Sequence, residues 1–175
     1  MINPNVLRRK VLDMVYEKKS GHIGGSFSMA ELTSVLYDDY DIGGKDKFIL
    51  SKGHAVPIIY AILHELGRIS DEDLSSFREI NSPLQGQNDG WSKDFSSMYD
   101  NLRERISSFG WECEVIDGHD TNIISTKLAV ESDKPRCIIL NTMKGKGVSF
   151  MEDPSWHAKV PTEEQYEQAT KELGV

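Results

Sequence analysis

A strand–helix–strand pattern in the last third of the chain limits the possible folds more than any other stretch of the sequence. Residues 112–116 and 136–140 are short apolar runs typical of buried strands, and Asp120 is placed to cap a helix that extends to about residue 131. Strands joined through a helix by short turns run parallel. The sequence therefore predicts an α/β fold with a small, mostly parallel sheet flanked by helices.

The rest of the chain is dominated by helical patterns separated by turns. Ser28 and Ser70 each begin a capping box, and the glycine-rich segment 21–26 is expected to be a loop that carries a histidine. The apolar run 47–51 is expected to be a buried strand in or near the sheet. Helices are expected over residues 3–19, 28–39, 57–66, 70–80, 95–109 and 162–173.

Length and charge limit the functional classes. A chain of 175 residues suits a single domain with a real core. Its 20 Lys and Arg against 28 Asp and Glu give a net charge of −8, which argues against nucleic-acid and membrane partners. No apolar run approaches a membrane span, and the N-terminus lacks the pattern of a signal peptide, so a cytoplasmic protein is expected. Cys113 and Cys137 lie in strand-like runs and are expected to be buried and reduced.

Four of the five histidines lie in turns, where α/β folds place their ligand contacts. They are His22, His54, His119 and His157. His54 is the best candidate, because it follows an expected strand and opens a helix whose amides favour an anion. The alternative is that each histidine only satisfies backbone groups of its own turn, and His119 is expected to do so. His64 lies within a helical pattern and is expected at the surface or the edge of the core.

A Lys-Gly-Lys-Gly stretch at residues 144–147 follows the last expected strand. Glycine permits close approach of the backbone, so Lys144 and neighbouring amides can hold a phosphate; the alternative is a solvated loop. Walker, G-x-G-x-x-G, G-x-S-x-G, H-E-x-x-H and C-x-x-C motifs are absent from the sequence. A histidine-based metal hydrolase has little support, since the histidines lack the spacing of metal ligands.

Several segments taken together, in this order along nearly the whole chain, resemble the N-terminal domain of transketolases. The resemblance is greatest to proteins that encode only this half, in which a second polypeptide supplies the C-terminal half. The segments are residues 20–26, 50–55, 82–86, 109–111, 117–120, 144–147 and 156–159.

The resemblance implies transfer of a two-carbon ketol unit between sugar phosphates with thiamine diphosphate and a divalent metal such as Mg²⁺. It implies that His22 contacts substrate hydroxyls and that His54 faces the diphosphate and the reacting carbonyl. His157 and Lys144 are then expected at the diphosphate. The resemblance thus implies that His22, His54 and His157 converge on one face of the domain.

The sequence departs from the family pattern in three places. Gln87 stands where the family has a substrate-contacting histidine, and it cannot act as an acid or a base. Between residues 90 and 95 the chain skips the block that holds the family's metal ligands, so no metal-binding residue is assigned. The resemblance also leads us to expect that the half with the aminopyrimidine pocket belongs to a second polypeptide. The implied partner is a transketolase C-terminal subunit or a second copy of the chain.

Two functions from different classes follow from this pattern. The first is the N-terminal subunit of a split transketolase, a transferase that is inactive as an isolated chain. The second is a degenerate, non-catalytic relative that serves as a binding or interaction module. The skipped block argues against catalysis by the chain alone but leaves partner binding open.

Overall fold

The computed structural model describes residues 1–85 and 101–175 of the chain. Two parallel strands and several helices make up this part, which confirms the expected α/β class. In chain order the elements are α1 (Pro4–Lys18), α2 (Ile23–Phe27), α3 (Ala30–Asp39), η1 (Gly53–Ala55), α4 (Pro57–Glu65), α5 (Asp71–Ser75), α6 (Leu102–Ser108), β1 (Glu112–Asp117), α7 (Thr121–Leu128), β2 (Arg136–Asn141), η3 (Ser149–Met151), η4 (Pro154–Trp156) and α8 (Glu163–Leu173).

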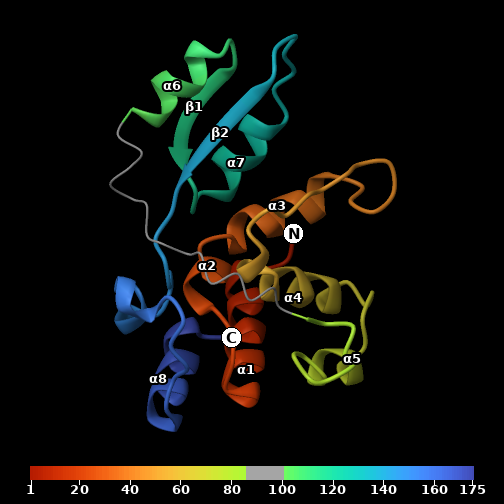
Figure 1. Cartoon of the computed structure of the whole chain (residues 1–175), viewed down its shortest axis with the longest axis vertical. Helices are drawn as coiled ribbons and strands as arrows, with labels where there is room; N and C mark the ends of the chain where they lie inside the picture. The colour runs from red at the N-terminus through yellow and green to blue at the C-terminus, as the bar shows by residue number, and fades with distance from the viewer. Residues whose placement is uncertain (86–100) are drawn as a thin grey trace.

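The elements divide into two regions (Figure 1). The helical region comprises residues 1–85 and 142–175, and its central helix α1 packs against α2, α3, α4 and α8. The βαβ region comprises residues 101–141, with β1, α7, β2 and the short helix α6. Helix α3 joins the two regions because it contacts both α1 and α7. The carboxyl ends of both strands point toward the helical region (Figure 1).

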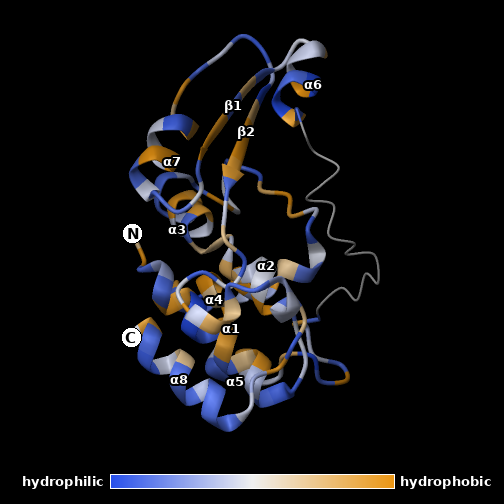
Figure 2. Cartoon of the chain, turned by 90° about the vertical axis from the view of Figure 1, so that its left-hand side faces the viewer, coloured by the Kyte–Doolittle hydropathy of each residue, from blue (hydrophilic) through white to orange (hydrophobic). Residues whose placement is uncertain are grey.

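The two strands pair in parallel, as the strand–helix–strand pattern predicts. Their register runs from Glu112 opposite Arg136 to Asp117 opposite Asn141. Cys113 and Cys137 are partners in this register; both thiols are free, and both side chains are half-buried rather than buried. Figure 2 shows that hydrophobic residues line much of both strands, whereas α8 is largely hydrophilic on its outside.

The helical region holds the main core. Fully buried aliphatic and aromatic side chains from α1, α2 and α4 meet there, including Leu12, Phe27 and Ile62. Helix α8 adds Ala169 and Leu173 to the same cluster. Burial of so many apolar side chains makes this cluster the principal source of stability.

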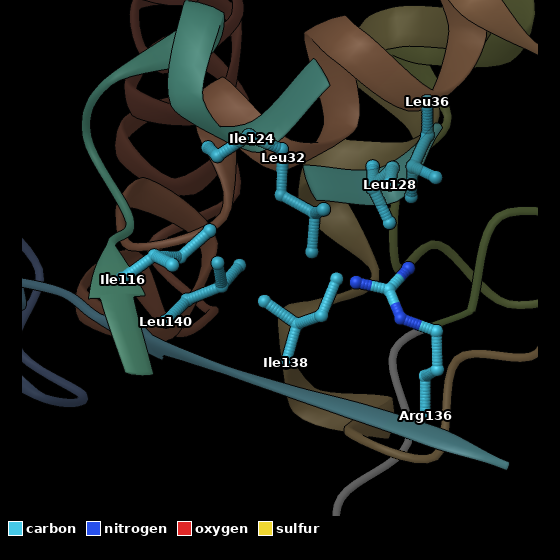
Figure 3. Close-up of a pocket in the computed structure, with 8 residues that line it drawn as sticks. All are labelled: Leu32, Leu36, Ile116, Ile124, Leu128, Arg136, Ile138 and Leu140. Atoms are coloured by element: carbon cyan, nitrogen blue, oxygen red, sulfur yellow. The ribbon is translucent and has the colours of Figure 1, made fainter. Parts of the chain in front are cut away.

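The core of the βαβ region is much smaller. Its fully or nearly fully buried members are Val35, Ile116 and Ile124. Beside them lies a cavity of about 330 Å³, and side chains from α3, α7 and both strands point into it from all sides (Figure 3). The lining residues are Leu32, Leu36, Ile116, Ile124, Leu128, Arg136, Ile138 and Leu140.

Helix caps follow the sequence closely at several ends. Asp120 accepts hydrogen bonds from the first-turn amides of α7, as predicted. Ser70 with Asp73, and Thr162 with Gln165, form reciprocal capping boxes at α5 and α8. Helices α1, α4 and α8 lie where the periodicity places them.

The expected strand at residues 47–51 is wrong. This segment has no regular secondary structure, and the nearest pairing is an isolated bridge between Ile42 and Asp46. Phe48 and Leu50 face a pocket formed with α3 and α4, whereas Ile49 is 86% exposed. Phe48 and Leu50 therefore face helices instead of joining the sheet.

The capping box expected at Ser28 does not form. Its hydroxyl donates to the carbonyl of Gly24, and α3 begins two residues later, at Ala30. Glu31 instead accepts hydrogen bonds from the guanidinium of Arg8 in the core. The segment 21–26 is also not a simple loop, because most of it forms α2.

Other boundaries differ by part of a helix. Helix α5 ends at Ser75 rather than near residue 80, and α7 ends at Leu128 rather than near residue 131. The helix expected over residues 95–109 is seen as α6 from Leu102, and its earlier part falls outside the described residues. In the described part of the chain, no helix has the length and hydropathy to cross a membrane.

Candidate functional site

Three of the predicted histidines converge. The ring centroids of His22 and His54, and those of His22 and His157, are 5.4 Å apart. Those of His54 and His157 are 5.3 Å apart. The three rings form a nearly equilateral triangle although they are distant in sequence, which confirms the expectation that they share one face.

His22 is the N-cap residue of α2, and the preceding glycine allows the chain to reach this position. Gly21 has a φ of +143°, and a Cβ at this residue would lie 2.6 Å from a methyl carbon of Val15. Any other residue would therefore be strained and would clash with α1. The hydroxyl of Ser26 donates to the carbonyl of His22 and approaches that of Ala55 at 3.4 Å. This contact joins the turns that carry His22 and His54.

His54 lies in the single turn η1, just before α4. Its Nε2 atom would be only 3.2 Å from a Cβ added to Gly25, so the imidazole packs directly against the backbone of α2. A side chain at Gly25 would displace the ring. The glycine pair in α2 thus supports the histidine cluster by permitting this close approach.

Lys144 and His157 approach α2 at the neighbouring glycine. A Cβ on Gly24 would lie 3.5 Å from the Cβ of Lys144 and 3.6 Å from the Cα of His157. Gly145 has a φ of +72°, and a Cβ there would lie 2.0 Å from the carbonyl oxygen of Met151. The glycine after Lys144 is therefore required by the fold of the loop.

The electrostatics of the site favour an anion. Burial is the largest cause that lowers the pKa of His157 below its ordinary value of 6.5. The remaining causes are the positive charges of Lys144, His54, His22 and Lys52. These five residues are here called the basic cluster. A concentration of like charge in a chain of net charge −8 indicates that an anionic ligand would relieve the repulsion.

Lys52 was missed by the sequence-based reasoning. It precedes the turn η1, and burial together with the charge of Lys144 lowers the pKa of its ammonium group. The segment 50–55 contains the signal, since Lys52 is two residues before His54. A turn that directs one side chain into a site also places its near neighbours around that site.

The expectation that His119 serves only its own turn is wrong. Its Nδ1 atom lies 3.0 Å from a carboxylate oxygen of Glu31, and its Nε2 accepts from the amide of Met143 at 2.7 Å. His64 lies at the edge of the core on α4 and contacts Asp71, in line with expectation. Gln87 lies outside the described residues.

The donors of the basic cluster fit one part of the expected cofactor better than another. Imidazole and ammonium groups suit the oxygens of a diphosphate, whereas Mg²⁺ takes oxygen ligands. Over residues 1–85 and 101–175, no group of three or more His, Cys, Asp or Glu side chains is arranged to hold a metal ion. The described residues thus fit a diphosphate and do not fit Mg²⁺.

Comparison with solved structures supports the fold. A transketolase from Campylobacter jejuni superposes with a TM-score of 0.84 over 98% of this chain and 42% of its own, at 22% identity. A Pichia stipitis transketolase in complex with sedoheptulose-7-phosphate gives a TM-score of 0.82 over 98% of this chain and 40% of its own, at 17% identity.

Comparison with curated proteins finds one relative that this chain matches over most of its length and others that it matches over less than half. An apulose-4-phosphate transketolase subunit from Phocaeicola vulgatus is 26% identical over an alignment that covers 95% of this chain and 90% of that protein. Human transketolase is 25% identical, and the match covers 97% of this chain but only 41% of that protein. This chain therefore spans under half the length of the human relative.

The family model described as transketolase, thiamine diphosphate binding domain, matches residues 3–94, which include His22, His54 and Lys52. This match covers more than half of the chain. The fold, the converging histidines and this match together show that the chain belongs to the transketolase thiamine diphosphate binding domain family.

Proposed function

We propose that this chain is the N-terminal subunit of a two-chain transketolase and supplies the surface that faces the diphosphate and the substrate. The observation that carries the proposal is the basic cluster, in which three imidazoles and two ammonium groups meet on one side of α2. The Phocaeicola vulgatus relative, which is itself named as one subunit of a transketolase and matches over 90% of its length, supports a division of the enzyme into two chains.

Within this proposal the two lysines neutralise the diphosphate. Lys144 acts on both Lys52 and His157 by charge repulsion, and Lys52 also acts on His157. Without an anion, each positive charge therefore raises the free-energy cost of keeping the others protonated. An anion bound between them would reverse the repulsion and raise the proton affinity of His157. Proton uptake should therefore accompany binding.

The imidazoles provide proton donors and acceptors for the substrate. His157 is held in its neutral form near pH 7 by its lowered pKa, so one of its ring nitrogens can donate and the other can accept. His22 and His54 lie at nearly the same distance from each other as from His157, which permits more than one of them to reach the same sugar phosphate. We assign His22 to the substrate hydroxyls and His54 to the oxygen of the reacting carbonyl.

Thiamine diphosphate, when bound, supplies the carbon nucleophile for transfer of a two-carbon ketol unit. The chain's own residues bind and orient the diphosphate and exchange protons with the sugar. The proposal assigns Lys144 and His157 to the cofactor and His54 to both cofactor and substrate. Gln87 is assigned a hydrogen-bonding role toward the substrate that involves no proton transfer.

The missing internal block is part of the proposal. The alignment with the Phocaeicola vulgatus relative extends over 257 residues although this chain has 175, which supports a deletion relative to that protein. The block skipped near residues 90–95 is the one to which the family resemblance assigns the metal ligands. We therefore expect the chain alone to bind thiamine diphosphate and Mg²⁺ no better than in the millimolar range, about −4 kcal/mol.

Reconstitution tests the proposal. The chain is mixed with a transketolase C-terminal subunit, and ketol transfer between sugar phosphates is measured with thiamine diphosphate and Mg²⁺. Activity that needs both chains, and that falls on His54→Gln or Lys144→Met, supports the split enzyme. The control is His64→Gln, which lies outside the basic cluster and should leave activity unchanged.

A second candidate function is a non-catalytic binding module. The observation in its favour is that the described residues provide no group for Mg²⁺. In that case the two chains would associate, which size-exclusion chromatography detects, but no ketol transfer would follow. Micromolar binding of thiamine diphosphate by the lone chain, measured by titration calorimetry, would contradict the account of the deleted block.

A further inference from the structure

A hydrogen-bonded connection through His119 leads from the helical core to the loop that carries Lys144. We infer that the neutral imidazole of His119, held between the Glu31 carboxylate and the Met143 amide, is a positioning residue that fixes Lys144 in the basic cluster. The inference rests on the proposed function, because it concerns anion binding by that cluster. His119 itself lies outside the cluster.

The position of His119 follows from the parallel sheet. It lies in the turn after β1, and Met143 lies in the loop after β2, so the two residues meet at the same edge of the sheet. The turn and the loop fit closely, because the amide of Gly118 donates to Asn141 at 2.9 Å. A Cβ on Gly118 would lie 2.5 Å from a side-chain carbon of Thr142.

The two hydrogen bonds of His119 determine its tautomer. A backbone amide can only donate, so Nε2, which receives the Met143 N–H at 2.7 Å, carries no proton. The proton of the neutral ring is then on Nδ1 and is donated to Glu31 at 3.0 Å. A protonated ring would oppose the amide with an N–H group of its own. The connection is therefore directional and requires the neutral form.

Glu31 is a rigid anchor for this imidazole. Its side chain is buried, and both carboxylate oxygens accept from Nη2 of Arg8 at 2.7 Å. Arg8 is itself 2% exposed and also donates to the carbonyl of Phe27. A buried ion pair of this kind keeps its geometry because its partners cannot be replaced by water. The orientation of His119 is thus set by the main core.

Met143 transfers the constraint to Lys144. Its amide is held by His119, and its carbonyl faces the hydroxyl of Ser28 at 3.4 Å. Both sides of the Met143 backbone are therefore held while its own side chain is 45% exposed and contributes little packing. The next residue, Lys144, places its Cβ against Gly24. Without the His119 bond, the Met143 amide would lose this partner, and the backbone just before Lys144 would no longer be tied to the turn after β1.

The test compares two substitutions that differ in polarity. In His119→Gln an amide can still donate to Glu31 and accept from Met143, whereas His119→Leu removes both bonds. The probe is inorganic pyrophosphate, and its dissociation constant is measured by NMR titration of the full chain. We expect about a tenfold weakening in His119→Leu, as for other residues that orient a ligand-binding group, and little change in His119→Gln.

A double substitution isolates positioning from general stability. If His119 acts through Lys144, then His119→Leu should add little to the loss caused by Lys144→Met. His64→Leu is the matched control and should leave the dissociation constant unchanged. Equal pyrophosphate binding by wild type and His119→Leu would overturn the inference while leaving the proposed function intact. Absence of pyrophosphate binding in the wild type would also overturn the inference, whereas the proposed function is tested separately by ketol transfer after reconstitution, because the lone chain is expected to bind no better than in the millimolar range.

The ring nitrogens give a readout that does not need the leucine variant to fold. In wild-type protein, ¹⁵N shifts should show His119 protonated at Nδ1 and unprotonated at Nε2. Glu31→Gln should weaken this preference and shift the amide signals of Met143 and Lys144. A ring protonated at Nε2, or Lys144 signals unaffected by Glu31→Gln, would contradict the connection.

Discussion

The helical region and the βαβ region differ in the size of their cores and in how closely those cores are packed. The first has a continuous core to which α1, α2, α4 and α8 all contribute fully buried side chains. The second has three well-buried residues, a two-stranded sheet and a cavity of about 330 Å³ (Figure 3). All five residues of the basic cluster lie in the helical region, but the loop of Lys144 follows directly after β2. This loop is held at Met143 by His119 of the βαβ region, so the well-packed region carries the site and the sparsely packed region supports one part of it.

The largest expected effect comes from the same substitution made in each region. Ile62→Ala in α4 and Ile124→Ala in α7 remove equally buried side chains, each 1% exposed. Loss of an Ile side chain from a core costs about 2–5 kcal/mol. We expect Ile62→Ala near the upper end, because its surroundings are closely packed, and Ile124→Ala near the lower end, because it already lines a cavity. Urea denaturation measures both; equal losses would show that the regions are packed alike.

Substitution by a larger side chain should change the free energy of unfolding in opposite directions in the two regions. Leu128→Phe extends into the cavity and should raise the free energy of unfolding by about 0.5–1 kcal/mol. Leu12→Phe, at a fully buried position of α1, should lower it by about 1–3 kcal/mol through overpacking. Thermal denaturation of the two variants measures the contrast. Destabilisation by Leu128→Phe would mean that the cavity cannot accept a ring.

Helix caps provide a smaller comparison. Asp120→Ala removes the cap of α7, and Thr162→Ala removes the cap of α8; each should cost about 1 kcal/mol. Native-state hydrogen exchange is expected to show that the first change lowers protection mainly in β1, α7 and β2. The second should lower protection of the main core, because α8 is part of it. A global effect of Asp120→Ala would indicate that the regions unfold together.

The smallest expected effect is a dependence of stability on pH. The folded state lowers the pKa of His157, so the unfolded chain binds more protons at pH values between the lowered value and 6.5. The contribution of His157 to the free energy of unfolding is therefore greatest above pH 6.5 and declines as the pH falls through that interval. Denaturation at several pH values should therefore show a weaker acid dependence in His157→Gln. Pyrophosphate should oppose the decline in the wild type, since it favours the protonated ring.

Local chemistry explains why much of the fold was predictable. Periodic apolar residues, the Asp120 cap and the capping box at Thr162 act over a few positions, and each produces the expected element. The strand expected at residues 47–51 failed because an apolar run alone does not say whether a helix or a strand will cover it. In the structure, Phe48 and Leu50 face a pocket lined by residues of α3 and α4, and Ile49 is exposed.

The candidate site was predictable only in part. The family resemblance brought His22, His54 and His157 together, and the structure confirms that they meet. The bond between His119 and Glu31 joins residues 88 positions apart, so no local pattern reveals it. Lys52 was missed because its contribution is a charge acting through space on His157. Such contacts depend on how the elements pack, which spacing alone does not determine.

The contact between α1 and α8 has a consequence for protein synthesis. Tyr166 of α8 stacks on Tyr16 and donates to Asp13, and Leu173 completes the cluster around α1. At about 5–20 residues per second, the ribosome needs on the order of ten seconds to make the chain between these two helices. During that interval α1 displays an apolar face to solvent or to chaperones. The packing around α1 is thus completed only after α8 has left the ribosome.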